Sequence, residues 1–468
     1  MSRRNLFWLL GIVSVSALGL AFAYSAPTRE KDKDYELVRL LVDVLHEVRQ
    51  KYVVDVDPER ERKLVEDMIN GGLERLDQHS QYINPREYKQ FDKHSEGKFG
   101  GVGIQVGYDR QKGGLLSVIS PMAGTPAYEA GVLAGDVILA IDGKQTESMR
   151  MSEAIDLIQG EPGSKIVFDL QRDGVKEPLK ITIARAIIQV PTVMGDTRKI
   201  DNPKEWDYVI DKKDRIAYVR VASFGKNTSA ELRTVVETLE KDGIRGLIID
   251  LRNNPGGLLR SAVEISDLFL TEGLIVSTKG RNHKDEVYRA QLEGTLLEGP
   301  GGQIPIVVLV NKYSASASEI VSAALQDHKR AVVIGERSYG KGSVQNIILM
   351  ENETSALKLT TASYWRPSGK NIHRFPNKKD FEAAKLDPDE WGVKPDAGFD
   401  VKLTDEERTR YQINRAERDI IRKTPAKPKK DKDGNVEAPF VDRVLDKALD
   451  HMRKTVEKQP VAAPKGDA

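Results

Sequence analysis

The first part of the chain carries hydrophobic residues at helical spacing. Between residues 35 and 95, two runs of apolar side chains recur every three or four residues, which is the period of an amphipathic helix. The first run is Leu37, Leu40, Leu41, Val44, Leu45 and Val48, and the second is Leu64, Met68, Ile69, Leu73 and Leu76. We expect a helical N-terminal domain over residues 35–95 that packs on its neighbour, and we assign no chemistry to it.

Residues 98–187 have a different pattern, with short β-like runs, turn signals and one short amphipathic stretch. A glycine-rich segment from Phe99 to Ile104 opens this region, and a unit from Gly135 to Gly143 (GDVILAIDG) follows it. Two further strand-like runs lie near Val167 to Arg172 and Leu179 to Ala184. This order of features resembles a PDZ domain, which we expect over residues 98–187.

The glycine-rich opening of the PDZ-like region has a physical use. Glycines let successive backbone N–H groups point into one concavity that holds a carboxylate. The strand that follows offers an edge to which an extended peptide can add. We therefore expect Gly101, Val102, Gly103 and Ile104 to bind the C-terminus of a peptide or protein.

Strand and helix signals alternate between residues 188 and 400, which indicates an α/β core with a largely parallel sheet. The expected strands are Arg215–Val221, Gly246–Leu251, Ile304–Val310, Ala331–Ile334, Val344–Met350 and Ala356–Tyr364. The expected helices are Thr228–Lys241, Leu258–Leu270 and Ser316–Asp327.

The C-terminal part is expected to hold two helices, joined by a linker at residues 424–435, within residues 403–457. Residues 371–391 read as a charged insertion in the core, and residues 458–468 as a disordered tail. The last helix carries a stripe with heptad-like spacing. Two alternatives stay open for it: packing on the chain's own core, or contact with a second copy in a homo-oligomer. The stripe is Val441, Leu445, Ala448 and Met452.

Composition argues against several classes of function. The chain of 468 residues has 72 Lys and Arg, 71 Asp and Glu, and a net charge of +1, whereas a general nucleic-acid binder shows a strong basic excess. It has no cysteine, which excludes disulfides, zinc–thiolate sites and a cysteine nucleophile. Its seven histidines include no i, i+4 pair typical of a metal site. We expect no nucleic acid, metal or other cofactor.

The N-terminus has the pattern of an export signal. Arg3 and Arg4 precede an apolar run from Leu6 to Ala23, which ends in an A-x-A-like cleavage site, Ala21-Phe22-Ala23. Residues 1–26 are therefore a cleaved signal peptide or a retained membrane anchor. Either alternative places the rest of the chain outside the cytoplasm, in the periplasm or cell envelope.

Ser316 and Lys341 are the candidate reactive pair, 25 residues apart. A serine becomes nucleophilic when a base takes its proton, and a lysine can be that base if burial lowers its pKa. Local sequence alone also permits a structural role, since Ser316-x-x-Glu319 is a helix-capping box. It does not choose among Ser314, Ser316 and Ser318.

Lys341 also has a nucleotide-binding alternative. Gly335-x-x-x-x-Gly340-Lys341 is nearly a phosphate-binding P-loop, and an apolar strand precedes it. That motif continues with Ser or Thr and then a helix. Gly342 comes next here, and a β-like segment follows, so the sequence argues against a nucleotide site.

The segments around Ser316 and Lys341, in this order and at this spacing, resemble the carboxyl-terminal processing (tail-specific) proteases. The resemblance implies a crotonase-like ββα-repeat core with an inserted PDZ domain. It makes Ser316 the nucleophile and Lys341 the base, and gives Gln345 the role of orienting the lysine. It places the oxyanion hole at the N–H groups of Gly257 and Ala317.

The same resemblance gives supporting roles to Asp327 and Ser338. His328-Lys329 departs from the family pattern, in which a glycine commonly precedes the position of Arg330, so the conformation of that turn stays open.

Taken together, the sequence predicts an exported serine endopeptidase whose PDZ domain captures the C-terminal tail of a protein or peptide. The alternative from another class is a catalytically silent PDZ adaptor of the cell envelope. The natural substrate, an activating adaptor protein and the oligomeric state are left open.

Overall fold

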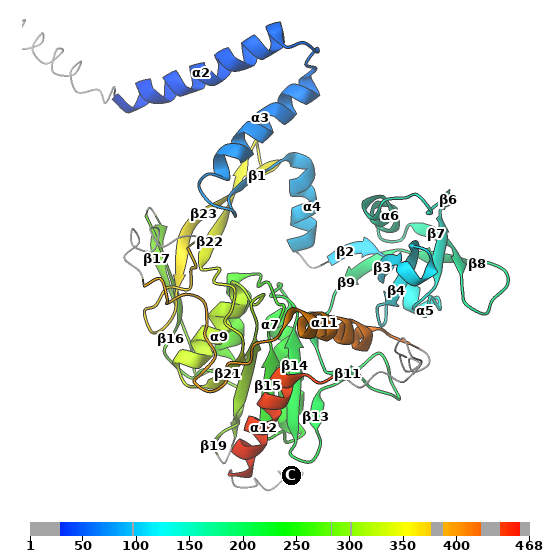
Figure 1. Ribbon diagram of the computed structural model, residues 1–468, viewed down its shortest axis with the longest axis vertical. Coiled ribbons are helices and arrows are strands. Elements are labelled where there is room, and N and C mark those ends of the chain that lie inside the picture. Colours follow the sequence, from blue (N-terminus) through cyan, green and yellow to red (C-terminus); the bar gives the residue numbers. More distant parts are fainter. Residues whose placement is uncertain are drawn as a thin grey trace, which may run out of the picture. The chain divides into compact units, whose positions relative to one another are not determined.

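The computed structural model describes residues 29–95, 98–281, 283–299, 302–375, 387–422 and 440–458 (Figure 1). These residues belong to two compact units that divide after Tyr82. None of the described helices is both long and apolar enough to cross a membrane. Four predictions lie wholly or mainly outside the described residues: the leader at 1–26, the insertion at 371–391, the linker at 424–435 and the tail at 458–468.

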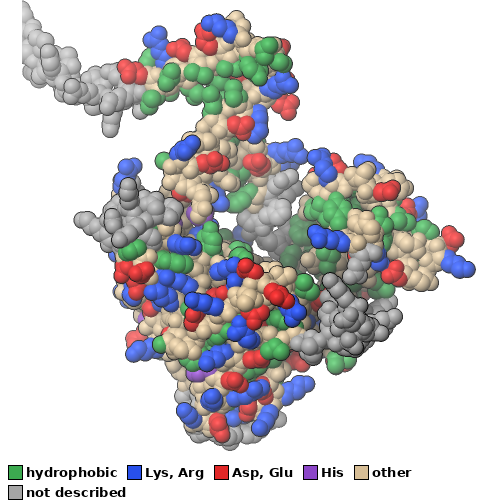
Figure 2. Space-filling model, in the orientation of Figure 1, with side chains coloured by type: hydrophobic (Ala, Val, Ile, Leu, Met, Phe, Trp, Pro, Cys, Tyr) green, Lys and Arg blue, Asp and Glu red, His purple; other side chains and the backbone are tan. Residues whose placement is uncertain are grey.

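The N-terminal unit contains two helices, α2 (Arg29–Lys51) and α3 (Pro58–Leu73), and the start of a short strand, β1 (Gln81–Ile83). Asp57 caps α3 by accepting a hydrogen bond from the Arg60 N–H at 2.8 Å. The apolar face predicted for the first helix forms on α2 but is exposed, and Figure 2 shows its hydrophobic side chains gathered along that helix.

The second unit begins with α4 (Pro85–Ser95) and continues into an antiparallel β-domain. Its main sheet has the strand order β3–β4–β5–β7–β8, β6 pairs with β5, and β2 and β9 form a separate pair. Among the described strands β3 pairs with β4 alone, so it is a sheet edge to which a peptide can add. The bounds are β2 Lys98–Gly101, β3 Ile104–Asp109, η1 Arg110–Lys112, β4 Leu115–Pro121, α5 Pro126–Glu129, β5 Val137–Ile141, β6 Lys144–Gln145, α6 Met151–Ile158, β7 Lys165–Gln171, β8 Leu179–Ala184 and β9 Ala186–Gln189.

The larger domain is built on a sheet of order β10–β14–β15–β20–β21, with β14, β15, β20 and β21 parallel. Side chains alternate across a strand, so the sheet buries a different set on each face. Ala217 and Val219 of β14 lie in the cluster with α7, α8 and α9, whereas Ile216 and Tyr218 lie in the cluster with α12. The α/β core with a largely parallel sheet is therefore confirmed. The strands are β10 Val193–Met194, β13 Val209–Asp211, β14 Ile216–Val221, β15 Gly246–Asp250, β20 Ile306–Val310 and β21 Ala331–Gly335.

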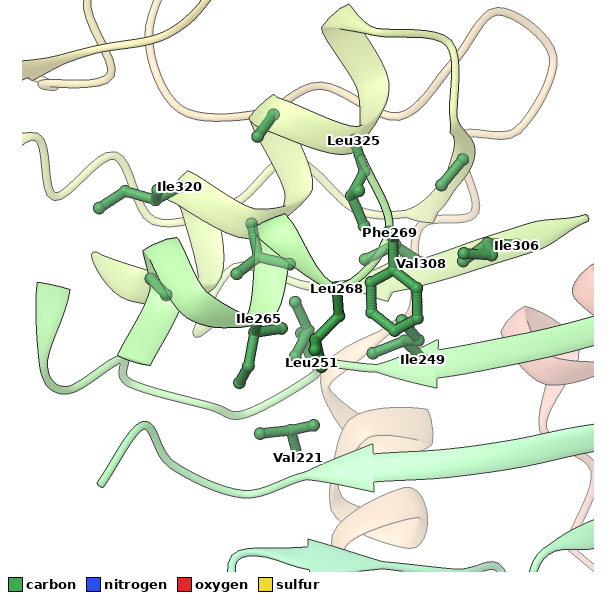
Figure 3. Packing of buried hydrophobic residues seen from close by; sticks show 14 of the residues in the cluster. Val221, Ile249, Leu251, Ile265, Leu268, Phe269, Ile306, Val308, Ile320 and Leu325 are labelled. Carbon is green, nitrogen blue, oxygen red and sulfur yellow. The ribbon is translucent and has the colours of Figure 1, made fainter. Parts of the chain in front are cut away.

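Three helices cover one face of this sheet: α7 (Thr228–Lys241), α8 (Leu259–Asp267) and α9 (Ala317–Asp327). Figure 3 shows side chains of α8 and α9 packed with side chains of the strands, Ile320 and Ile265 among them. Every residue of α9 from Ala317 to Leu325 is buried. The start of this helix is therefore held by packing on all sides.

A second sheet borders the larger domain. Its strand β23 pairs antiparallel with β22 along most of its length and with β16 near its end, and β16 pairs with β17. The sequence predicted β22 and β23 but missed β16 and β17. The bounds are β16 Leu274–Gly280, β17 His283–Arg289, β22 Ser343–Met350 and β23 Ser355–Trp365, with short pairs β11 Thr197–Arg198 and β12 Trp206–Asp207, and β18 Glu298–Gly299 and β19 Gly302–Gln303.

The chain's last two described helices are α11 (Asp405–Asp419) and α12 (Arg443–Glu457). Leu445, Ala448 and Met452 of the predicted stripe are buried with the second face of the large sheet. Val441, which precedes α12, is 63 % exposed. Since these three residues are covered within the chain, the structure favours self-packing of the stripe, and the alternative of a homo-oligomer stays a prediction.

The turn after α9 shows how this chain accommodates Lys329, at the position where the family pattern commonly has a glycine. Lys329 adopts a left-handed conformation with a φ of 56°, which a glycine adopts more readily. Its N–H bonds to Gln326 O and the Arg330 N–H to Leu325 O, the two hydrogen bonds of a Schellman motif. The turn that a glycine would favour is therefore formed here by a lysine.

Candidate active site

Ser316 lies at the start of α9, in the loop that follows β20. It is the N-cap residue of the helix, with a φ of 55° and a ψ of −114°. A positive φ is strained for a residue with a side chain, and such conformations persist where the surroundings enforce them. The Ser316 side chain makes no capping hydrogen bond to the helix.

The two neighbouring serines have structural partners. The Ser314 hydroxyl donates to Leu251 O at 2.8 Å, and the Ser318 hydroxyl donates to Asn254 O at 2.9 Å. The Ser316 hydroxyl has no hydrogen-bond partner among the described residues. Of the three serines, Ser316 is therefore the one whose hydroxyl is not engaged in the described structure, which favours it over its neighbours.

A turn from Asn253 to Gly257 packs directly against Ser316. A Cβ on Gly256 would lie 2.8 Å from Ser316 Cβ, and one on Gly257 would lie 2.2 Å from Phe224 O, so neither position has room for a side chain. Gly256 and Gly257 also have positive φ values, of 100° and 149°. Close approach and backbone conformation thus both require glycine.

Two backbone N–H groups beside Ser316 are free to bind a ligand. Within the described part of the chain, neither the Gly257 N–H nor the Ala317 N–H has a hydrogen-bond acceptor. Their neighbours do: the Gly256 N–H donates to Asn254 Oδ1 at 2.8 Å, and the Leu258 N–H to Phe224 O at 2.7 Å. These are the two N–H groups that were predicted from the sequence as oxyanion-hole donors, and that role stays a prediction.

A buried arginine holds the base of the same turn. Arg252 is paired with Asp250, with its Nη2 2.7 Å from Asp250 Oδ2, and with Asp442, with its Nη1 2.8 Å from Oδ1. Its guanidinium also lies over the ring of Tyr411, 4.3 Å from the centroid. Because Asp442 is the N-cap of α12, the end of the chain helps to position the turn.

Lys341 lines the same cleft as Ser316, together with Gln345 and Gly257. The cleft has a volume of about 2060 Å³. Burial lowers the pKa of the Lys341 amine, the positive charge of Lys358 lowers it further, and Glu319 acts in the opposite direction. No acidic group within the described ranges forms an ion pair with Lys341. An amine in this setting is suited to accept a proton.

Glu319 joins the two halves of the site. Its fully buried carboxylate accepts four hydrogen bonds: from the Ser316 N–H at 2.8 Å, the Ser338 hydroxyl at 2.5 Å, the Gly340 N–H at 2.6 Å and the Lys341 N–H at 2.8 Å. Burial nevertheless raises its pKa to about 7. The sequence identified Glu319 only as half of a capping box. No sequence pattern predicted its contacts with residues 338–341.

Gln345 and Ser338 contact the site in different ways. Gln345 Nε2 donates to Ser343 Oγ at 2.8 Å and to Thr360 Oγ1 at 3.3 Å, and no hydrogen bond joins it to Lys341. Ser338 bonds to Glu319 and also accepts from the Val393 N–H at 2.7 Å. Ser338 therefore supports the loop that carries Lys341.

Asp327 and His328 lie at the opposite end of α9 from Ser316. Asp327 holds Arg366 at 2.6 Å and the Ser368 N–H at 3.0 Å. His328 Nε2 contacts Leu274 O at 2.7 Å. At a rise of about 1.5 Å per residue, the length of α9 separates these side chains from Ser316. Neither is placed to act on the Ser316 hydroxyl.

The predicted carboxylate loop precedes the edge strand β3. Val102 is fully buried, its carbonyl accepts from the Ala127 N–H at 2.9 Å, and the Gly103 carbonyl accepts from the Met122 N–H at 2.8 Å. Gly103 has a φ of 79°, and a Cβ there would lie 2.3 Å from Thr125 Cβ. The N–H groups of Val102 and Gly103 have no acceptor among the described residues, as a carboxylate-binding loop requires.

The chain is similar to known proteins over most of its length. Residues 215–383 match the model of peptidase family S41, and residues 117–172 match that of the PDZ domain. A carboxy-terminal-processing protease of Bartonella bacilliformis is 38 % identical over 87 % of this chain and 87 % of its own length. The carboxy-terminal processing protease CtpA of Bacillus subtilis is 34 % identical over 73 % of this chain and 70 % of its own length. A solved photosystem II D1 C-terminal processing protease aligns with a TM-score of 0.40 at 26 % identity, covering 76 % of this chain and 86 % of that one.

Glu319→Gln tests the link between the two halves of the site. An amide nitrogen cannot accept a hydrogen bond, so either orientation of glutamine leaves at least one buried N–H without an acceptor, a loss of about 1–3 kcal/mol. We expect that loss in urea unfolding, and a roughly ten- to hundredfold slower reaction of Ser316 with a fluorophosphonate.

Glu336→Gln is the matched control, because Glu336 accepts from Arg408 at 2.6 Å and lies outside the network of Glu319. It should lower stability while folded protein still reacts at the normal rate. An unchanged rate in Glu319→Gln would show that the site does not need this carboxylate.

Proposed function

Since this chain belongs to the carboxy-terminal processing proteases of peptidase family S41, we propose that its serine-peptidase activity uses Ser316 as nucleophile and Lys341 as base. The observation that carries the proposal is the unengaged Ser316 hydroxyl. It lies beside two N–H groups without acceptors, those of Gly257 and Ala317, in a cleft that also contains a lysine with a lowered pKa.

The proposed reaction begins with attack of Ser316 Oγ on the carbonyl carbon of the scissile peptide bond. Lys341 Nζ accepts the hydroxyl proton, and the Gly257 and Ala317 N–H groups stabilise the negative oxygen of the tetrahedral intermediate. When the intermediate collapses, the C–N bond breaks and Lys341 returns the proton to the leaving amine. Water then attacks the acyl-enzyme, with Lys341 again the base, and releases the new carboxylate.

Gln345 has a supporting role in this proposal. It lies on β22 only four residues beyond Lys341, and its amide nitrogen is held by Ser343 and Thr360. Those bonds fix the side chain at the wall of the cleft that Lys341 also lines. We assign to Gln345 the shaping of that wall.

The proposed substrate is a protein or peptide that is recognised by its C-terminus. The free N–H groups of Val102 and Gly103 can hold the terminal carboxylate, and the open edge of β3 can pair with the residues before it. We further propose that the protein is exported, because residues 1–26 carry a basic end, an apolar run and an A-x-A-like site.

Ser316→Ala tests the nucleophile. It should abolish cleavage of an unfolded protein substrate without changing the stability of the enzyme, because the hydroxyl makes no hydrogen bond to any residue that the structure describes. Ser314→Ala removes two buried hydrogen bonds and Ser318→Ala removes one, each worth about 1 kcal/mol, and both variants should retain activity. Cleavage assays with EDTA and without nucleotide measure this. Full activity in Ser316→Ala would exclude Ser316 as nucleophile.

Lys341→Arg tests whether the base at position 341 must be able to lose its proton. Arginine stays protonated at any working pH, so this variant should be inactive, as should Lys341→Ala. In the natural enzyme the neutral amine is the active form. Its lowered pKa therefore implies that kcat/KM rises with pH through that pKa and levels off above it. An active Lys341→Arg enzyme, or a rate that falls over this range, contradicts the assignment.

Amidation of the substrate's last residue tests tail recognition separately. It removes the charge that the Val102 and Gly103 N–H groups are proposed to hold, so cleavage should slow mainly through a higher KM. The control is a short peptide whose reaction with Ser316 does not depend on its C-terminus. Equal rates for the free and amidated tails would reject the carboxylate loop while leaving the peptidase assignment intact.

A further inference from the structure

A second lysine, Lys358, shares the cleft with Lys341. Its position follows from the pairing of β22 with β23, in which Gln345 lies opposite Thr360 and Ile347 opposite Lys358. Residues two apart on a strand project from the same face. Lys358 therefore projects from the face that carries Thr360 and Gln345, and this face is a wall of the cleft.

The charge of Lys358 is not neutralised. It forms no ion pair and no hydrogen bond within the described part of the chain, although its side chain is only partly exposed. Lys204, which lines the cleft elsewhere, is paired with Glu129 at 2.8 Å. The acid of the site, Glu319, is occupied by four donors of its own. A partly buried positive charge is unfavourable without a partner, so its retention at the wall of the cleft suggests a function.

We propose that Lys358 is a positioning residue for the base: its unpaired positive charge disfavours a second positive charge on Lys341 and so favours the neutral form of the amine, which can take the Ser316 proton. The inference rests on the proposed Ser316–Lys341 mechanism and deepens it, because it adds a second cause to burial.

The electrostatics of Lys341 agree with this arrangement. Burial is the largest cause of its lowered pKa, and the charge of Lys358 is the second. Glu319, from α9, opposes both. None of the other charged residues that line the cleft is among the groups that act on Lys341: Arg86, Lys89, Asp156, Glu161, Arg198, Lys204, Glu231 and Asp419. Lys358 on β23 is thus the cation that offsets the carboxylate on α9.

The test uses Lys358→Met, which keeps the length of the side chain and removes its charge, with Lys358→Arg as the charge-conserving control. The full-length protein is reacted with a fluorophosphonate over a range of pH, and the rate of labelling of Ser316 is followed by mass spectrometry. This readout requires the base but no peptide tail, so binding at the PDZ domain does not enter.

For Lys358→Met we expect the rising limb of the pH–rate profile to move to higher pH. On that limb the labelling rate at a given pH should fall by about three- to tenfold, the effect of losing one nearby like charge, and should rejoin the natural rate at high pH. Lys358→Arg should give the natural profile. A profile of Lys358→Met that coincides with the natural one would overturn the proposal.

Two other outcomes also reject the role of Lys358. A loss of labelling rate that is equal at every pH would indicate a structural role. A natural labelling profile with a changed KM for acidic peptides, measured in parallel cleavage assays, would indicate a substrate contact. If Lys358→Met fails to fold in urea titrations, Lys358→Gln repeats the test. Failure of the mechanism itself is distinguishable, because the natural protein would then show no labelling of Ser316 or no rising limb.

Discussion

The active site depends on one buried carboxylate. A buried charge costs several kcal/mol unless hydrogen bonds replace its water. Glu319 receives those bonds from Ser316 at the start of α9 and from Ser338, Gly340 and Lys341 on the loop before β22. Two of the four donors are backbone groups of the very residues whose side chains are proposed to react. The carboxylate therefore fixes the proposed nucleophile and the proposed base relative to each other, through the backbone, and occupies neither side chain.

The same site depends on close packing that only particular residues permit. The Gly256–Gly257 turn touches Ser316 so closely that a Cβ on Gly256 would overlap it, and Ser316 itself has a positive φ. Strain of this kind persists because the neighbouring elements over-determine the conformation. Arg252 anchors the turn from the other side, between Asp250 and the N-cap of α12. Helix α12 thus buries an apolar stripe and also holds the turn beside Ser316.

Much of the fold could be predicted because buried parallel strands are continuous apolar runs, as in β15 and β20. Strand β17 could not, since its sequence, HKDEVYR, has no apolar pattern. The reactive pair was found through its resemblance to a family. The choice of Ser316 over Ser314 and Ser318 depends on acceptors more than sixty residues away in sequence. The stripe on α12 was ambiguous because an apolar face is buried equally well by the same chain or by a second copy.

The charges around Lys341 show what a lysine base requires of its surroundings. The amine must be neutral before the reaction and must hold a proton during it, so an environment that strongly favours either form would slow one of the two steps. Glu319 anchors the Lys341 backbone but, as a carboxylate, favours the protonated amine. Burial favours the neutral amine, and so does the charge of Lys358. Because the same carboxylate holds the backbone of both Ser316 and Lys341, a charge that opposes it must come from elsewhere in the cleft. Strand β23 is the element positioned to supply it.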